Sequence, residues 1–134
     1  MPAKILVVDD EVHLARIIQF MLEHEGFEVS IAFDGEEAIA KAWQENPDLI
    51  ILDLMLPVID GYRVCNILKE QEFFGDTPIM ILSARDPGSE HLDEPPRADY
   101  FMSKPFNTED LIDTIAALLS QRRHGMKVSG CPER

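Results

Sequence analysis

The chain lacks most of the features that define several large classes of protein. Only two of its 134 residues are cysteines, so a fold held together by disulfide bonds is excluded. Its unbroken apolar runs, such as residues 5–8 and 49–52, are far too short to span a bilayer. The first residues lack the apolar core of a secretion signal, and no glycine-rich phosphate-binding loop supports nucleotide binding.

Basic residues are scarce as well. Lysine and arginine number 12 against 25 aspartates and glutamates, which gives a formal charge of −13. Such a surface repels a phosphate backbone, so we predict no direct binding to nucleic acid and instead expect a cation or a basic partner. The hydrophobic content of 46% is typical of a globular domain. We therefore predict a cytoplasmic protein with no membrane association.

What the chain does contain is a regular alternation of two patterns. Short apolar runs, such as Ile5–Val8 and Ile79–Leu82, suit strands that are buried on both faces. Between such runs, apolar residues recur with the period of a helix, as in the stripe from Leu14 through Ile17 to Leu22. The prediction is strands over residues 4–9, 27–33, 48–53, 78–83 and 98–102, and helices over 11–25, 35–45, 60–72 and 107–122.

Strands that alternate with helices form a parallel sheet with helices on both faces. Right-handed crossovers leave few topologies, and we predict the α/β flavodoxin-like doubly wound fold, five strands in the order 2-1-3-4-5. Residues 86–97 hold three prolines, a glycine and one large apolar residue, so the fourth helix is predicted to be irregular or shortened. Residues 1–121 form the predicted domain, and residues 122–134 a mobile C-terminal tail. Trp43 is expected to serve packing.

Polar side chains stand at the carboxyl ends of the predicted strands, where parallel sheets bind their ligands. Asp9 and Asp10 follow the first strand, Asp53 ends the third, Ser83 ends the fourth, and Lys104 follows the fifth. Clustered carboxylates repel one another unless a cation neutralises them, and Mg²⁺ suits a site with so few oxygen ligands. Lys104 can pair with Asp53 or bind a phosphoryl oxygen. The set predicts a site for a phosphoryl group on a carboxylate, with Asp53 as the nucleophile.

The chain resembles a response-regulator receiver domain of two-component signalling over roughly residues 3–121. Four stretches carry the resemblance in the family's order: Lys4–Glu11, Asp53–Gly61, Ile81–Ala84 and Ala98–Phe106. Each stretch is weak evidence alone, and the four together at this spacing are specific. The resemblance implies that Asp53 accepts a phosphoryl group from the phosphohistidine of a sensor histidine kinase or of a phosphotransfer protein.

For the metal, the resemblance implies four ligands: the side chains of Asp9, Asp10 and Asp53, and the main-chain carbonyl of Met55. Mg²⁺ would be the only cofactor. The residues alone also allow a structural alternative. In that alternative the acids after the first strand cap a helix, and Lys104 simply pairs with Asp53.

Around the phosphoryl group, the resemblance implies contacts from Ser83 and Lys104, and it implies a cis peptide bond before Pro105. Phe101 matches the switch position, an aromatic residue whose rotamer follows the hydroxyl of Ser83. The chain departs from the family at Arg97, where a glycine is usual, and in the irregular segment 86–97. This segment belongs to the face through which receiver domains usually contact their partners.

The predicted function is therefore a phosphoacceptor signalling domain that catalyses only its own phosphorylation and dephosphorylation and is otherwise no enzyme. Its expected partners are the phosphodonor protein and either a downstream protein target or a dimer partner. Two alternatives stay open. The departures within residues 86–97 fit an interaction module that keeps the fold and never switches. The carboxylates also fit a hydrolase of small phosphorylated molecules, although no separate substrate domain is visible.

Overall fold

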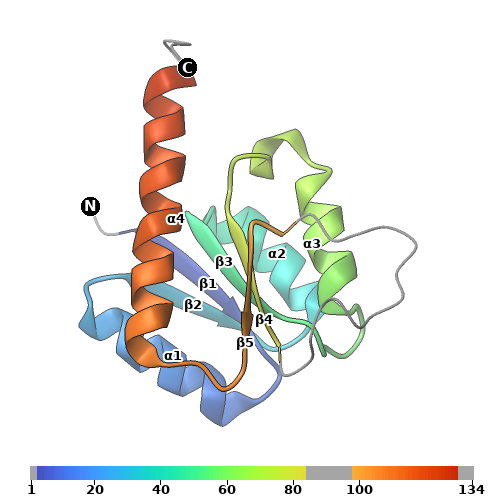
Figure 1. Cartoon of the computed structure of the whole chain (residues 1–134). Coiled ribbons are helices and arrows are strands. Elements are labelled where there is room, and N and C mark those ends of the chain that lie inside the picture. The colour runs from blue at the N-terminus through green and yellow to red at the C-terminus, as the bar shows by residue number, and fades with distance from the viewer. Residues whose placement is uncertain (1–2, 84–97, 130–134) are drawn as a thin grey trace.

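A computed structural model of the chain describes residues 3–83 and 98–129, with the backbone alone for Ser83 and residues 121–129 (Figure 1). Five parallel strands form one sheet in the order β2-β1-β3-β4-β5. The predicted flavodoxin-like topology is therefore confirmed. It follows from the alternation of apolar runs and helical stripes, since each crossover returns the chain in parallel through a helix.

The strands and helices have the following bounds. The strands are β1 (Lys4–Val8), β2 (Glu28–Ala32), β3 (Leu49–Asp53), β4 (Ile79–Ser83) and β5 (Tyr100–Ser103). The helices are α1 (Val12–His24), α2 (Gly35–Glu45), α3 (Gly61–Lys69) and α4 (Thr108–Ser129), with a short 3₁₀ turn η1 (Glu72–Phe74).

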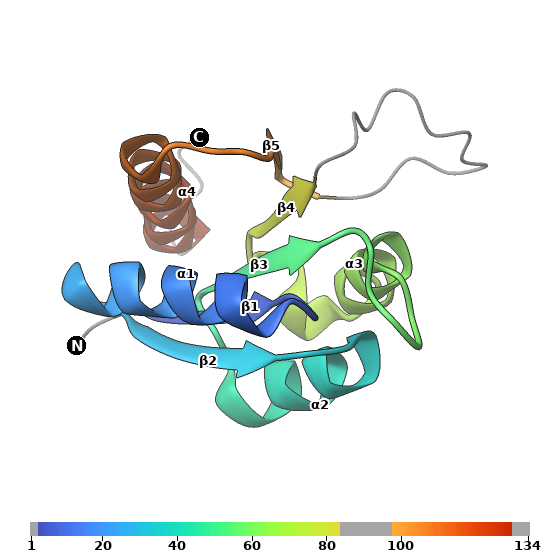
Figure 2. The same cartoon turned by 90° about the horizontal axis from the view of Figure 1, so that it is seen from below.

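The helices cover the sheet in two layers. Helices α1 and α4 lie on one face, and α2 and α3 lie on the other (Figure 2). The central strands β1 and β3 are buried on both faces, because their apolar residues alternate between the two cores. The polar edge of the sheet at the carboxyl ends of the strands thus lies next to two buried apolar cores.

Local signals in the sequence set the ends of several helices. The side chain of Asp34 caps α2 by accepting a hydrogen bond of 2.8 Å from the N–H of Glu37. Asp60 caps α3 in the same way, with a bond of 3.0 Å from the N–H of Arg63. Gly26, at φ 98°, stops the chain after α1 in a left-handed conformation that suits glycine.

Two helices end at other residues than predicted. Helix α3 ends at Lys69, and the stretch predicted to complete it forms η1. Helix α4 runs to Ser129, beyond its predicted end at residue 122, so most of the predicted tail is helical. The reason is that residues 121–129 are mostly good helix formers, and the single Gly125 lowers helix stability by only about 1 kcal/mol. The predicted irregular helix within residues 86–97 and the end of the predicted tail lie outside the described residues.

Within residues 3–83 and 98–129, no helix is both long and apolar enough to cross a membrane.

Candidate functional site

Strand pairing gathers the predicted site residues at the carboxyl edge of the sheet. β1 pairs with β3 as far as Val8, β3 with β4 as far as Asp53, and β4 with β5 as far as Ser83. Asp9 directly follows β1, and Lys104 directly follows β5. Residues that are far apart in the sequence therefore end in one row, as the rule for parallel sheets predicts.

The ammonium group of Lys104 is shared by two buried carboxylates. Its Nζ lies 3.4 Å from Oδ2 of Asp9 and 3.6 Å from Oδ2 of Asp53. The side chain of Lys104 is 18% exposed, and those of Asp9 and Asp53 are 3% and 10% exposed. A structural pair of Lys104 with Asp53 alone does not describe this arrangement, because one positive charge faces two negative ones.

Asp10 completes a cluster of three carboxylates. One oxygen from each of Asp9, Asp10 and Asp53 lies within 4.8 Å of the other two. Asp10 is exposed while the other two are buried, so solvent reaches the cluster at Asp10. The N–H of Glu11 donates to Oδ1 of Asp9 at 2.9 Å and orients it, and the Glu11 side chain forms no cap on α1. Hard oxygen donors with a net negative charge fit a divalent cation such as Mg²⁺.

Burial and like charge weaken the acidity of Asp53. The pKa of Asp53 is raised from 3.8 to about 6, chiefly by burial and further by the charges of Asp9 and Asp10. The ammonium of Lys104 and the N–H of Met55, which lies 3.4 Å from Oδ1 of Asp53, act in the opposite direction. The carboxyl group is still mostly ionised at pH 7, and an ionised carboxylate is the form that can act as a nucleophile.

Two glycines at the starts of helices pack closely against the loop that follows Asp53. Gly61 donates its N–H to the carbonyl of Leu54 at 2.9 Å, and a Cβ on Gly61 would lie against the carbonyl of Asp53 and 2.7 Å from Cα of Leu54. A Cβ on Gly35 would lie against the carbonyl of Ile59 and 2.7 Å from its Cβ. The sequence motif includes Gly61, but no role was predicted for Gly35. The one signal in the sequence for a role of Gly35 is its position directly after Asp34, which caps a helix.

The remaining predicted site residues surround this edge. Met55 lies two residues beyond Asp53, and its side chain is 58% exposed. Ser83 pairs with Ser103 at the end of β4, and its side chain lies outside the described part of the chain. Phe101 lies in β5, half-buried against the core under α2 and α3. The bond between Lys104 and Pro105 is cis, as the resemblance implied.

An apolar groove of about 410 Å³ adjoins the carboxylate cluster. The residues that line it are Glu11, His13, Leu14, Ile17, Lys104, Pro105 and Phe106. Sequence analysis grouped Ile17 with the apolar stripe of its helix, yet its side chain is 55% exposed. The stripe is wider than the face that the sheet and α4 cover, so its outer residues line the groove instead of the core.

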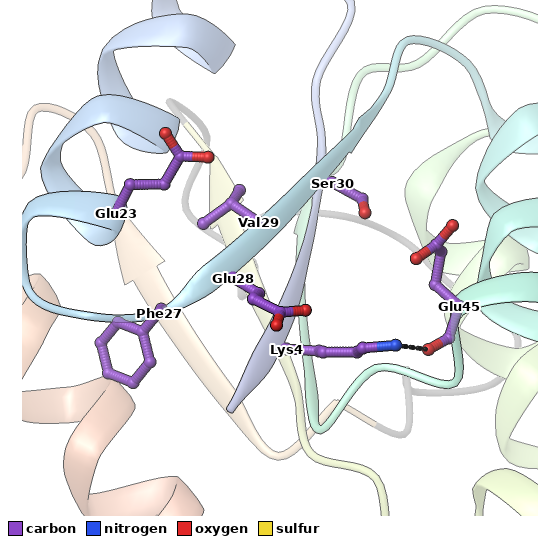
Figure 3. Close-up of a pocket in the computed structure, with 7 residues that line it drawn as sticks. All are labelled: Lys4, Glu23, Phe27, Glu28, Val29, Ser30 and Glu45. Carbon is purple, nitrogen blue, oxygen red and sulfur yellow. Dashed lines mark hydrogen bonds between the residues drawn. The ribbon is translucent and has the colours of Figure 1, made fainter. Parts of the chain in front are cut away.

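A second pocket of about 340 Å³ lies at the opposite end of the sheet, between the start of β2 and the ends of α1 and α2 (Figure 3). Its lining includes Glu23, Glu28 and Glu45, and Nζ of Lys4 donates to the carbonyl of Glu45 at 3.3 Å. None of the predicted site residues contributes to this pocket. It is therefore separate from the carboxylate cluster.

A doubly wound sheet with this cluster at its carboxyl edge defines a class of signalling domain. The chain belongs to the response regulator receiver domain family, whose model matches residues 5–116. Receiver domains of two-component systems are phosphorylated on an aspartate, and the family generally binds Mg²⁺. The match does not favour the alternative of an interaction module that never switches.

Known proteins of this family share both sequence and structure with the chain. It is 43% identical over 123 residues to the alkaline phosphatase synthesis transcriptional regulatory protein PhoP of Bacillus subtilis, a match that covers 89% of the chain and 49% of PhoP. The chemotaxis response regulator CheY4 of Vibrio cholerae is similar in structure, with a TM-score of 0.81 and 33% identity over 88% of this chain and 99% of CheY4. NtrX of Brucella abortus gives a TM-score of 0.86 and 30% identity over 97% of this chain and 29% of NtrX.

The chain spans about half the length of the curated relatives it matches, with 48% to 53% of each covered. PhoP is a transcriptional regulator, and the match covers only 49% of it. The prediction that nucleic acid is not bound directly therefore concerns this chain alone, and it stays a prediction.

Proposed function

We propose that this domain accepts a phosphoryl group on Asp53 from a phosphohistidine of a sensor histidine kinase or a phosphotransfer protein. One observation carries the proposal: a nearly buried Asp53 lies 3.6 Å from the ammonium of Lys104, which is also shared with a second buried carboxylate. The phosphoryl group then changes which protein the domain contacts, a downstream target or a second copy. The domain acts in the cytoplasm and catalyses only its own phosphorylation and dephosphorylation.

The chemistry needs one nucleophile and positive charge. An oxygen of Asp53 attacks phosphorus, the P–N bond of the donor breaks as the P–O bond forms, and the imidazole takes up a proton as it leaves. Lys104 neutralises the phosphoryl oxygens, and Ser83, which ends the neighbouring strand, donates a hydrogen bond to one of them. Phe101 then turns toward the space that Ser83 leaves, which couples the site to the surface around β5.

Intact mass spectrometry tests this proposal. Incubation with acetyl phosphate and Mg²⁺ is expected to add one phosphoryl group to the wild-type chain and none to the Asp53→Asn variant. Asp113→Asn, an exposed acid on α4, is the control and is expected to gain the group. A wild-type chain that gains nothing, or an Asp53→Asn variant that still gains the group, contradicts the assignment of Asp53.

Mg²⁺ fits the carboxylates of Asp9, Asp10 and Asp53, with the main-chain carbonyl of Met55 as the fourth ligand. It would supply the positive charge that offsets the repulsion among these oxygens and an incoming phosphoryl group. Because the cluster forms only in the folded chain, Mg²⁺ at about 100 times its dissociation constant is expected to stabilise the fold by about 2.7 kcal/mol. Thermal unfolding with Mg²⁺ and with a chelator measures this effect, and Asp10→Asn is expected to reduce it. Equal melting temperatures in both conditions count against a metal site.

The apolar groove beside Lys104 is the surface we assign to the donor protein. Leu14, Ile17 and Phe106 line it, and Lys104 belongs to both the groove and the site. A helix that docks there brings its histidine to the open side of the carboxylates, since exposed apolar patches next to a reaction site commonly bind partner proteins.

Substitution of Ile17 separates docking from chemistry. Ile17→Ser is expected to slow phosphotransfer from the donor protein by about tenfold and to leave the reaction with acetyl phosphate unchanged, because the small donor makes no use of the groove. Phe73→Ser, at a residue that is 56% exposed at the other end of the sheet, is the matched control. An equal loss of rate with the donor protein and with acetyl phosphate would instead show that Ile17 supports the chemical step or the folding of the domain.

A further inference from the structure

A patch of two exposed aromatic side chains lies at the opposite end of the sheet from the carboxylates. Trp43, near the end of α2, is 50% exposed, and Phe73 in η1 is 56% exposed. Trp43 packs against the buried Phe74, as predicted, and half of its surface stays exposed. Nζ of Lys4 donates to the carbonyl of Glu45, which ties this end of α2 to the start of β1. A partner on the patch would leave the phosphoryl site free.

The two rings are already held in place. They stack with centroids 5.3 Å apart and planes at 18°, and both contact Phe74 edge-on, at 4.7 Å from Trp43 and 4.9 Å from Phe73. Phe74 is fully buried in the core under α2 and α3. Rigid aromatic side chains that are anchored on one side lose little conformational entropy when they bind a partner.

The exposed charges that flank Phe73 along the chain all have one sign. Three exposed acids flank Phe73 along the chain: Glu70, Glu72 and Asp76. The basic residue of this stretch, Lys69, is turned inward: its side chain is 8% exposed, and its Nζ bonds the carbonyl of Thr77 at 2.6 Å and Oδ2 of Asp99 at 3.0 Å. The exposed charge of residues 70–76 is therefore entirely negative.

We propose that this aromatic patch, Trp43 with Phe73, binds a protein segment that presents arginine side chains between apolar ones. A guanidinium group stacks on an indole ring and pairs with a carboxylate through two hydrogen bonds, so both features of the patch are used. A second copy of the chain would bring like charges together, and nucleic acid or an anionic membrane would meet negative charge as well. The inference goes beyond the proposed function and does not depend on phosphorylation.

The patch carries its own reporter, because Trp43 is the only tryptophan in the chain. The unphosphorylated full chain is titrated with a synthetic peptide of alternating arginine and leucine, and Trp43 emission is expected to shift to shorter wavelength and to saturate. Phe73→Ser is expected to weaken binding by about tenfold, because half of the stacked pair is lost. Ile17→Ser, which removes a side chain that is 55% exposed in the groove, is the control and is expected to bind like wild type. Neither substitution changes the charge.

Three further measurements complete the test. Glu72→Gln is expected to weaken binding about threefold, while Glu109→Gln, on an exposed acid at the start of α4, is not. A peptide with glutamate in place of arginine is expected to give no shift. Circular dichroism melts show that each variant is folded. Failure of the arginine peptide to shift the emission overturns the proposal, as do equal affinities for Phe73→Ser and wild type, or equal binding of the glutamate peptide.

Discussion

Replacement of Gly61 by alanine is expected to lower the free energy of unfolding by about 3 kcal/mol, at the upper end of the range for overpacking. The added Cβ would lie against the carbonyl of Asp53 and 2.7 Å from Cα of Leu54, so a backbone and not a flexible side chain must move. The loop after Asp53 has little room to move, because the backbone of Gly35 lies close to Ile59. Val58 in this loop is also in the left-handed region, at φ 71°. Urea unfolding of the metal-free protein measures the loss.

The same substitution is expected to weaken Mg²⁺ binding by about tenfold or more, because the displaced backbone carries a proposed metal ligand at Met55 and the carboxylate of Asp53. Gly75→Ala is the matched control. A Cβ on Gly75 would lie 3.4 Å from the carbonyl of Glu72, an ordinary contact, so stability and Mg²⁺ affinity are expected to stay within about 0.5 kcal/mol of wild type. If Gly61→Ala loses stability and keeps its Mg²⁺ affinity, the glycine supports the fold without positioning the site.

The fold was predictable because its strongest signals are local. The runs in β1 and β3 are apolar without interruption, which only a strand buried on both faces requires, and Asp34 and Asp60 mark helix starts through their own side chains. The errors lie where local signals were weak. Residues 122–134 were predicted to be a mobile tail, but the small penalty of Gly125 does not stop a helix whose neighbours favour that conformation.

The site was predictable for a different reason, since all parallel strands deliver their carboxyl ends to one edge. Knowing the strand ends was enough to bring Asp9, Asp53 and Lys104 together. What remained hidden depends on tertiary contacts between segments distant in sequence. These features are the close approach of Gly35 to Ile59, the exposure of Ile17, and the half-exposed ring of Trp43. No periodicity reports which part of an apolar stripe a neighbouring helix leaves uncovered.

Asp53→Asn is expected to stabilise the metal-free protein at pH 7 by on the order of 2–3 kcal/mol. Burial and the charge of Asp9 raise the pKa of Asp53 from 3.8 to about 6, and each unit corresponds to about 1.4 kcal/mol. As pH rises, the unfolded chain loses this proton first, so wild-type stability falls between pH 4 and pH 6, and the loss stays complete above pH 6. The asparagine variant has no such proton to lose. Its advantage should therefore vanish near pH 4 and grow toward pH 7.

Denaturant unfolding of both proteins across this pH range, with a chelator present, gives the difference directly. Asp113→Asn on α4 is the control, because its exposed side chain lies outside the cluster, and its stability is expected to follow that of wild type. Saturating Mg²⁺ is expected to shrink or reverse the advantage of Asp53→Asn, since the cation removes the repulsion in wild type and loses a ligand in the variant. A difference that is the same at pH 4 and pH 7 would show that the variant gains its stability from packing or hydrogen bonding, and that the buried charge of Asp53 is already compensated by Lys104.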